Sequence, residues 1–569
     1  MEKWMVQAKK ADFYGIATKY GIDPVIARIM VNRGIPEEAM GDYLHPTLEQ
    51  LHDETLMKDL LLAANILKNA IEDGKHIRVI GDYDIDGICS TYILTEGIRR
   101  CGGNVDYAIP HRIEDGYGVN PQMMQQAQAD GVELVVTCDN GISAFPAMEE
   151  ARALGMEVII TDHHQLHYEE AEGKRVYKIP EALAVVNPHQ PDCTYPFKEI
   201  CGAVVAWKLI FGLYENCGIP RREAFDFLEM AAFATVGDIM PLQDENRAIV
   251  RAGLDKMKRT KNIGLHALME RSGIDASALS AYHIGFVLGP CFNATGRLDT
   301  ATLALELLQE TEPNQAIRRA EELIRLNEER KEMTERGVEA ALDIIEKEHL
   351  ENDQVLVVYV PGLHESLNGI VAGRLKERFY RPTFVLSDGA EYVKGSGRSI
   401  ESYVMNEKME ECSKYLKYYG GHPMAAGLSL ERDAIDGFRR EMNARANLSE
   451  TDLQPKVSID VPMPLSYITM DLVHQLDALE PFGNGNEKPC FADKDLRVER
   501  VFQIGKEKQY RKLRLRLTNG RSMDALYFGD AETMDEYLAS HDTIKITYYP
   551  SINVFRDEES LQVMITHFQ

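Results

Sequence analysis

The sequence lacks any long apolar run. No stretch reaches the roughly 18 consecutive apolar residues that a membrane-spanning helix needs, so we expect no membrane span. The first residues, MEKWMVQAKKADFYG, contain neither an apolar core nor a small-residue cleavage site. We therefore expect no secretion signal either.

Paired cysteines are also missing. The nine cysteines are scattered along the chain, and none belongs to a C-x-x-C pair. This argues against both a disulfide framework and a zinc knuckle. The expectation is a cytoplasmic protein with reduced cysteines.

Basic residues are too few to balance the acidic ones. Lys and Arg number 63 against 90 Asp and Glu, which gives a net charge of −27. Such a charge is unfavourable for a nucleic-acid partner, since phosphate binding depends on basic surface. An acidic protein can still bind nucleic acid through a local basic groove, or gather carboxylates around metal ions, and the charge alone favours neither.

The chain is long enough for several domains. Its 569 residues exceed the roughly 250–300 that one hydrophobic core serves, so we expect two to four domains. Short apolar runs alternate with helix-like stretches in two regions, a pattern typical of α/β domains, and the end of the chain reads as short strands with turns. The predicted division is 1–75 (N-terminal helical segment), 76–312 (first α/β domain), 313–350 (connecting helix), 351–448 (second α/β domain) and 455–569 (β domain).

Three aspartates stand at every second position of GDYDIDG (Gly81–Gly87), directly after the first predicted strand of the first α/β domain. Carboxylates crowded at one strand end repel each other and need a cation. Hard oxygen ligands favour Mg²⁺ or Mn²⁺. We take Asp82 and Asp84 as candidate ligands, with a solvated acidic turn or a helix cap as the simpler alternative.

Two later strands also end in candidate ligands. Asp139 follows VVTC, and His163 stands in TDHHQ after the next strand. Taken singly, Asp139 is better explained as a helix N-cap. His164 is a candidate to orient a ligand, hold substrate or donate a proton, and Asp162 is a candidate to hydrogen-bond a ligand from behind.

A last acidic residue, Asp238, lies in VGDIMPL between an apolar helix end and a proline turn, where a cap is again the simpler explanation. The combined pattern changes this interpretation, because functional groups gather at the carboxyl ends of strands in an open parallel sheet. Two ions about 3.5–4 Å apart would activate a water for in-line attack on phosphorus. The predicted metal ligands are Asp82, Asp84, Asp139, His163 and Asp238, and the predicted catalytic set adds His164.

These motifs match a known family. The set GDYDIDG, VTCDNG, TDHHQ and VGDIMPL resembles the four motifs of the DHH phosphoesterase superfamily. Further segments, in order over nearly the whole chain, resemble the bacterial RecJ single-strand DNA exonucleases. They are ARIMVNRGI, YLHPTLEQLHD, PHRIEDGYGVN, GPCFNATGRLD, HESLNGIVAGRLKERFYRP, GSGRS, GGHPMAAG and LEPFGNGNEKPCF.

The resemblance implies an α/β fold class: a parallel-sheet DHH domain, a long helix, a second α/β domain, and a C-terminal β-barrel with the oligonucleotide-binding fold. It implies two divalent cations, Mn²⁺ or Mg²⁺, as cofactors. Glycines let backbone N–H groups approach a phosphate, while Arg and His supply charge. The implied substrate contacts are Arg112, Arg297, His364, Ser396, Arg398, Gly420, Gly421 and His422.

The predicted barrel contains a basic segment. Between Gly505 and Leu517 six basic residues stand against Glu507, a net of +5. Alternating side chains would place one basic row on one face of a strand, and Tyr510, Tyr527 and Phe555 could stack on bases. The alternative is a solvated strand face with aromatic residues in the core.

The sequence departs from the family in three places. Cys291 stands where the family commonly has an arginine, Leu363 where it has a tryptophan, and Ser366–Asn368 replaces a small, apolar stretch. These changes bear on how the DNA end is held and leave the predicted metal ligands untouched.

The resulting prediction is a metal-dependent exodeoxyribonuclease. It would hydrolyse single-stranded DNA from 5′ to 3′, release 5′-mononucleotides, and act in recombination and repair; direction and DNA preference come from the resemblance alone. Expected partners are single-stranded DNA and a helicase or single-strand-binding protein, for a monomer without membrane contact. The alternatives are a DHH phosphodiesterase for short RNA or cyclic dinucleotides, a non-catalytic DHH scaffold, and a pyrophosphatase.

Overall fold

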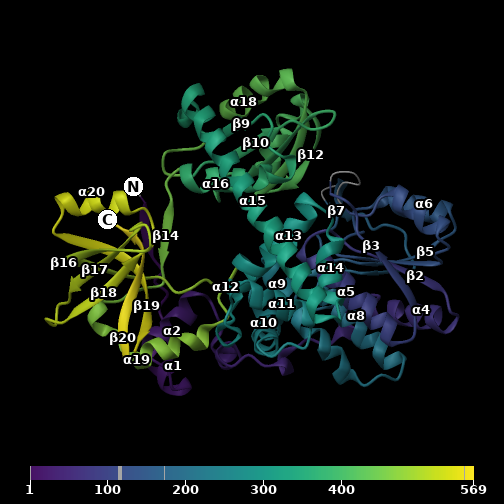
Figure 1. Ribbon diagram of the computed structural model, residues 1–569, viewed down its shortest axis with the longest axis horizontal. Coiled ribbons are helices and arrows are strands. Elements are labelled where there is room, and N and C mark those ends of the chain that lie inside the picture. The colour runs from purple at the N-terminus through teal and green to yellow at the C-terminus, as the bar shows by residue number, and fades with distance from the viewer. Residues whose placement is uncertain (1, 113–117, 172–173, 557) are drawn as a thin grey trace.

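Three units lie at the corners of a triangle in the computed structural model (Figure 1). The structure describes residues 2–112, 118–171, 174–556 and 558–569. Residues 113–117, part of the PHRIEDGYGVN segment, lie outside the described residues.

The first unit is built on a five-stranded sheet whose strands are all parallel. The strand order reverses between β2 and β4, so their carboxyl ends border the crevice in which open α/β sheets place functional groups. The sheet order is β3 (Asn104–Ala108), β2 (His76–Ile80), β4 (Leu134–Cys138), β5 (Glu157–Thr161) and β8 (Ala184–Val186).

Helices cover both faces of this sheet. One face packs on α4 (Leu60–Glu72), α5 (Ile85–Arg100) and α8 (Gly202–Asn216), and the other on α6 (Pro121–Ala129) and α7 (Phe145–Ala153). Burial on both faces explains why the strands read as continuous apolar runs. A helical layer follows, with α9 (Leu228–Gly237), α10 (Asp244–Met257), α11 (Ile263–Arg271), α13 (Gly289–Leu298) and α14 (Thr302–Gln309).

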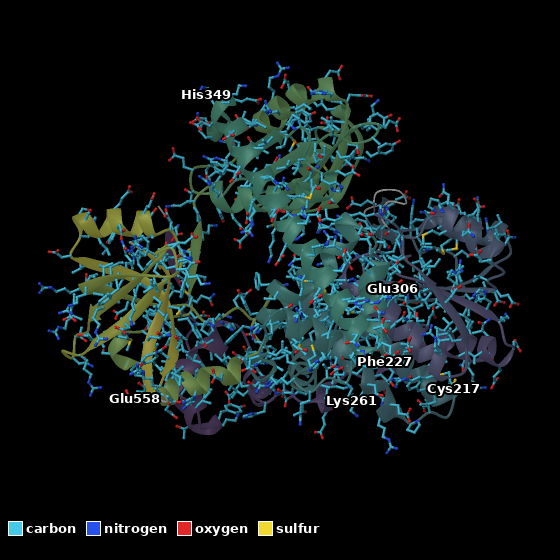
Figure 2. All side chains as sticks on the ribbon, viewed as in Figure 1. Cys217, Phe227, Lys261, Glu306, His349 and Glu558 are labelled. Carbon is cyan, nitrogen blue, oxygen red and sulfur yellow. The ribbon has the colours of Figure 1, made fainter. Side chains whose placement is uncertain are left out.

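A single helix, α15 (Pro313–Glu348), runs from the first unit into the second. Its residues have high helix propensity, and Pro313 stands at the first helical position, where proline is tolerated. The helix ends at His349, whose φ of 56° is left-handed. Figure 2 shows this residue at the outer end of the second unit.

The second unit contains a mixed five-stranded sheet. Only the β9–β10 pair is parallel, and the other pairs are antiparallel. The order is β12 (Leu416–His422), β13 (Ala425–Leu430), β11 (Val393–Arg398), β10 (Thr383–Ser387) and β9 (Leu356–Tyr359), with α16 (Asn368–Phe379) and α18 (Ile435–Ala444) packed alongside.

The third unit is a β-barrel. Its strands are β15 (Val461–Pro462), β16 (Phe491–Ile504), β17 (Tyr510–Arg516), β18 (Ser522–Tyr527), β20 (Glu558–Phe568) and β19 (Thr543–Phe555). The long β16 pairs with both β17 and β19, which closes the sheet on itself. Closure removes open strand edges.

The two ends of the chain fold together. Helices α1 (Phe13–Tyr20) and α2 (Pro24–Asn32) share one apolar core with the barrel. Strand β1 (Lys3–Val6) pairs with β14 (Lys456–Ile459), and both termini lie beside the barrel (Figure 1). Helix α4 instead packs with the first sheet, so the predicted N-terminal segment divides between two cores.

Arg247 connects the barrel side to the first unit. This arginine of α10 is 2% exposed. It donates hydrogen bonds to the carbonyl oxygens of Tyr43, Ala478, Leu479 and Glu480, at 2.8–3.1 Å. One buried side chain therefore ties α10 to both the N-terminal segment and the approach to the barrel.

The predicted fold class is confirmed. The parallel-sheet domain, the long helix, the second α/β domain and the terminal barrel are all present. No helix among the described residues has the length and apolar character to cross a membrane. All nine cysteines are free thiols.

Candidate metal centre and substrate face

The first motif lies in the turn between β2 and α5. Asp84 is the N-cap of α5, and its carboxylate accepts the backbone N–H groups of Asp86 and Gly87 at 3.0 and 3.1 Å. Asp82 is 1% exposed and stands two residues beyond β2. The motif thus combines a helix cap with a buried carboxylate, so capping and metal binding are compatible explanations of it.

His163 lies at the centre of the candidate site. Its Nε2 atom is 3.1 Å from Oδ1 of Asp139, which follows β4 directly, and 3.7 Å from Oδ2 of Asp238 at the end of α9. It is also 3.5 Å from Oδ2 of Asp86. Carboxylate oxygens and an imidazole nitrogen at this spacing suit Mn²⁺ or Mg²⁺, so the donor set fits a divalent cation.

The carboxylates of the centre disfavour one another as anions. Burial, with the nearby charge of Asp84, raises the pKa of Asp82 to about 8. Burial and the carboxylate of Asp86 raise the pKa of both Asp139 and Asp238 well above the usual range. Buried like charges are costly unless a cation or protons compensate them, which is the electrostatic signature of a metal centre.

Asp162 supports the centre from behind. It is 1% exposed and accepts the backbone N–H groups of Ile142, His163 and His164 at 2.7–3.1 Å. Its Oδ1 atom also lies 2.7 Å from Nδ1 of His164. Although burial acts in the opposite direction, the charge of His164 lowers the pKa of Asp162 to about 2. Asp162 thus orients His164 and the turn bearing His163, as its predicted supporting role requires.

Asp86 is the residue that the sequence interpretation left out. It is fully buried, and its carboxylate accepts the N–H groups of Gly202 and Ala203 at 2.6 and 2.8 Å, at the N-terminus of α8. A helix N-terminus favours a negative charge. The third aspartate of GDYDIDG could have indicated Asp86 as a candidate. Nothing in the sequence indicates the contact between Asp86 and α8.

Arginines gather beside this centre. The guanidinium of Arg112 lies 4.8 Å from the centre of the Tyr83 ring. Burial, with the nearby charges of Arg112 and Arg330, lowers the pKa of Arg297 to about 9. Burial and Arg112 likewise lower the pKa of Arg398 on β11. Like charges from both α/β domains are held close enough to repel, which favours a bound anion.

The other predicted contacts lie on the sheet of the second domain. The strand register aligns Ser396 with Gly427 and Gly420, and Arg398 with Ala425 and His422. Alternate residues of a strand share a face, so these side chains occupy one side of the sheet. A Cβ atom on Gly420 would meet nothing within 4 Å. This open, glycine-containing face, with Gly421 beside it, can be approached closely by a phosphate backbone.

His364 and Arg297 meet at Ser366. Nδ1 of His364 lies 2.7 Å from the Ser366 hydroxyl, and Arg297 donates to the Ser366 carbonyl oxygen at 2.7 Å. Ser366 belongs to the segment where the sequence departs from the family. The departure therefore adds a hydroxyl that contacts His364, while Arg297 contacts the backbone of the same residue.

Cys291, another departure, is buried, and its Sγ atom lies 3.2 Å from the carbonyl oxygen of Val287. Burial raises the pKa of its thiol to about 11. The side chain of Arg330 on α15 lies close enough to influence both Cys291 and Arg297 electrostatically. Arg330 thus supplies a cation near the position where the family's usual arginine is absent, and no motif marks it in the sequence.

The basic strand of the barrel differs from its prediction. Lys512 and Arg514 both pair with Asp524 of the neighbouring strand, at 2.7 and 2.5 Å. Arg511 pairs with Asp535 and Arg516 with Glu499, at 2.6 and 2.9 Å. The net charge counted along the segment is therefore largely neutralised by acids from elsewhere in the barrel.

The three aromatic residues of the barrel that were predicted to stack on bases differ in exposure. Tyr527 is partly buried against Phe568, with ring centres 5.4 Å apart. Tyr510 packs edge-on against Phe528 at 5.0 Å. Phe555 is 65% exposed, with the guanidinium carbon of Arg556 5.2 Å from the centre of its ring. Exposure thus leaves Phe555 as the clearest stacking candidate of the three.

Known proteins match this architecture. Residues 76–235 match the DHH family, N-terminal domain, residues 352–448 the DHHA1 domain, and residues 459–567 the RecJ OB domain. A single-stranded-DNA-specific exonuclease RecJ of Bacillus subtilis is 34% identical over 99% of this chain and 70% of its own length. The Escherichia coli protein of that name is 32% identical over 96% of this chain and 95% of its own length.

Solved structures agree. RecJ from Thermus thermophilus in complex with Mn²⁺ superposes with a TM-score of 0.84 at 27% identity, covering all of this chain and 79% of that one. Its complex with Mg²⁺ superposes with a TM-score of 0.79. The order of domains, the identity over nearly the full length and the superposition place the chain in the RecJ family of exonucleases.

Proposed function

We propose that this protein hydrolyses single-stranded DNA from the 5′ end and releases 5′-mononucleotides. One observation carries the proposal: a buried carboxylate–histidine centre lies beside arginines from both α/β domains. The relatives named above are single-stranded-DNA-specific exonucleases, which supports the same substrate here. A role in DNA recombination and repair follows from such an activity.

The proposed metal ligands are Asp82, Asp84, Asp139, His163 and Asp238, of which His163 lies at ligand spacing from Asp139 and from Asp238. The two Thermus complexes support Mn²⁺ or Mg²⁺ as the ions. When bound, two such ions supply an activated water and stabilise the charge that develops on the phosphate oxygens. Asp86 anchors the centre to α8. Asp162 holds His164 in place as the candidate to contact a phosphate oxygen or to give a proton to the leaving 3′ oxygen.

Arg297, Arg112 and Arg398 are proposed to bind the terminal 5′ phosphate. They repel one another without an anion, and a doubly charged phosphate monoester compensates them better than an internal diester does. Binding of the 5′ phosphate beside the centre would set the direction of digestion, because it places the first phosphodiester of that end at the candidate ligands. His364, Ser396 and the glycine-containing face with Gly420, Gly421 and His422 would hold the adjoining backbone.

We also propose a cytoplasmic location, a monomeric state and a protein partner. The nine free thiols fit a reducing compartment such as the cytoplasm. A monomer suffices, since both domains that contribute to the candidate site belong to one chain. A helicase or a single-strand-binding protein would supply the single strands.

The test uses an oligodeoxynucleotide labelled at one end and incubated with the protein and Mn²⁺. A 5′ label should leave at once as a mononucleotide, whereas a 3′ label should pass through successively shorter strands. Asp139→Ala should abolish both patterns. Release from the 3′ end, or no release, would contradict the proposal. Preference for a dinucleotide or short RNA would favour the oligonucleotide phosphodiesterase alternative.

A further inference from the structure

Two large aromatic rings of the catalytic domain are exposed to solvent. Tyr282 is 61% exposed and Phe286 is 69% exposed. Their rings are stacked on each other, with centres 5.0 Å apart and planes inclined by 29°. Large aromatic side chains are usually buried, so a stacked and exposed pair marks a surface that can bind another flat apolar group.

The segment that carries these rings is firmly anchored. It consists of α12 (Ala281–His283) and a π-helical turn (Ile284–Leu288) that leads into α13. Ile284 and Leu288 are fully buried, whereas Phe286 between them faces solvent. Single π-helical turns are rare and often occur at functional sites. The turn therefore presents Phe286 outward from a rigid base.

This base packs directly on the metal centre. A Cβ atom on Gly289 would lie 3.3 Å from Cδ1 of Ile85, and one on Gly285 would lie 3.9 Å from Cγ1 of Val236. Asn293 of α13 accepts the backbone N–H of Ile85 at 2.9 Å. Ile85 follows Asp84, and Val236 stands two residues before Asp238. The segment that carries the aromatic pair thus packs next to two of the segments that carry candidate ligands.

A third exposed apolar side chain belongs to the same region. Ile239, directly after Asp238, is 69% exposed, and its φ of 58° is strained for a β-branched residue. Asn484 donates to its carbonyl oxygen at 2.7 Å and helps to hold this conformation. The strained backbone and the exposed apolar side chain of Ile239 both cost folding free energy. A conformation held at this cost supports a role for Ile239 in binding.

We propose that Tyr282 and Phe286 stack against DNA bases on the 3′ side of the cleaved phosphate, with Ile239 packing at the edge of the first base. This inference rests on the proposed function and deepens it. Helix α12 lies on the side of the catalytic domain that faces the barrel (Figure 1). A strand that is held by its 5′ phosphate at the centre and extends toward the barrel would pass this side.

Stacking on these rings also contributes to the choice of single strands. Every base offers a flat face, so the contact is tolerant of sequence. In a duplex each base is already stacked on its neighbours and paired with its partner. The rings can take bases only from a strand whose bases are free.

The test compares oligodeoxynucleotides that differ only in having their bases removed at defined positions from the 5′ end. Binding is measured by fluorescence anisotropy with the cleavage-deficient Asp139→Ala protein and with the double variant Tyr282→Ala/Phe286→Ala in that background. Stacking predicts that the double variant binds the intact strand roughly 5- to 100-fold more weakly. It also predicts little difference between the two proteins on a strand that lacks the stacked bases.

Two further variants separate stacking from simple apolar contact and from general surface effects. Phe286→Trp should bind as the unmutated protein does, whereas Phe286→Leu should bind more weakly. Tyr14→Ala removes an aromatic side chain that is 77% exposed on α1 and should change nothing. Equal binding of the intact strand by double variant and parent would overturn the inference, as would a loss of the same size on intact and abasic strands.

Release of mononucleotides by the protein without these substitutions reports separately on the proposed function. If nucleotides are released normally but the double variant binds as its parent does, the stacking inference fails and the exonuclease proposal stands. We expect each variant to fold, because both rings are exposed and their loss removes little buried surface. Circular dichroism and thermal unfolding verify this.

Discussion

Gly202, at the start of α8, lies directly against the backbone of Asp139. A Cβ atom on Gly202 would come within 2.8 Å of Asp139 Cβ and 3.0 Å of its Cα. Gly202→Ala should therefore push Asp139 out of position without altering any candidate ligand. We expect exonuclease activity to fall about 100-fold, since displacement of a reacting group by about 1 Å has an effect of this order.

Gly212→Ala is the matched control for this change. Gly212 lies on the same helix, and an added Cβ would meet Cδ2 of Leu60 at 3.1 Å and Cβ of Ala64 at 3.3 Å, away from any candidate ligand. Both variants should remain folded, but only Gly202→Ala should lose most of its activity. Equal activities would mean that the close approach to Asp139 has no functional role.

Asp162→Asn tests the support behind the centre. The change removes the negative charge that holds His164 and leaves a side chain of nearly the same shape. We expect Mn²⁺ affinity or activity to fall about 10- to 100-fold, the usual effect of losing a group that orients metal ligands. Calorimetric titration with Mn²⁺ measures this, and Asp192→Asn, at a side chain 67% exposed, is the control.

Divalent cations should stabilise the fold. The buried carboxylates of the centre repel one another, and a bound cation removes this repulsion. At a Mn²⁺ concentration 100 times the dissociation constant, the free energy of unfolding should rise by about 2.7 kcal/mol. Thermal unfolding with Mn²⁺ and with a chelator measures the effect.

The variant Asp139→Asn sharpens this comparison, because it removes one repelling charge and one candidate ligand together. With the chelator it should be at least as stable as the unmutated protein. With Mn²⁺ it should gain much less stability. A full gain would place the ion elsewhere.

Arg297→Met should reveal whether the arginine group reads the 5′ end. A hydrogen bond to a charged group contributes about 1.5–3 kcal/mol, which corresponds to roughly 10- to 150-fold. We expect kcat/KM to fall by this factor on a 5′-phosphorylated strand and much less on a strand with a 5′ hydroxyl. Arg336→Met, an exposed arginine of α15, serves as the control. Equal losses of kcat/KM on both strands would mean that Arg297 does not recognise the 5′ phosphate.

Arg247→Met should loosen the connection between the catalytic domain and the barrel. The change removes the donor from the carbonyl oxygens of Tyr43, Ala478 and Glu480, while that of Leu479 keeps its hydrogen bond from Asn486. Unsatisfied buried groups cost about 1–3 kcal/mol each. We expect a lower unfolding temperature and weaker binding of long strands, with short strands affected less. Arg251→Met, one turn further along α10 and exposed, should leave both unchanged.

Local sequence patterns predict a candidate centre at the carboxyl ends of the strands. Asp82, Asp139 and His163 each follow an apolar strand, and a parallel sheet necessarily brings such positions together. A single motif indicates Asp84 as a helix cap, and the combined motifs indicate it as part of the centre. In the structure Asp84 is the N-cap of α5 and lies beside the centre.

Relationships between distant segments could not be predicted in the same way. Nothing local to Asp86 indicates that α8 donates to it from more than a hundred residues away. The charge of Lys512 and Arg514 was overestimated because Asp524 lies on the neighbouring strand and not in the same segment. Arg330 resembles the other arginines of α15, and only the fold places it beside Arg297.

The shared core of the two chain ends has a consequence for synthesis. Asn32 of α2 donates to the carbonyl oxygen of Asp460, 428 residues later. At a translation rate of about 5–20 residues per second, roughly 20–90 seconds pass between the synthesis of Asn32 and that of Asp460, and the barrel that buries the first helices is completed only after that. During that interval their apolar faces have no native partner, so the nascent chain is exposed to aggregation from its first helices onward, and ribosome-associated chaperones should bind it there.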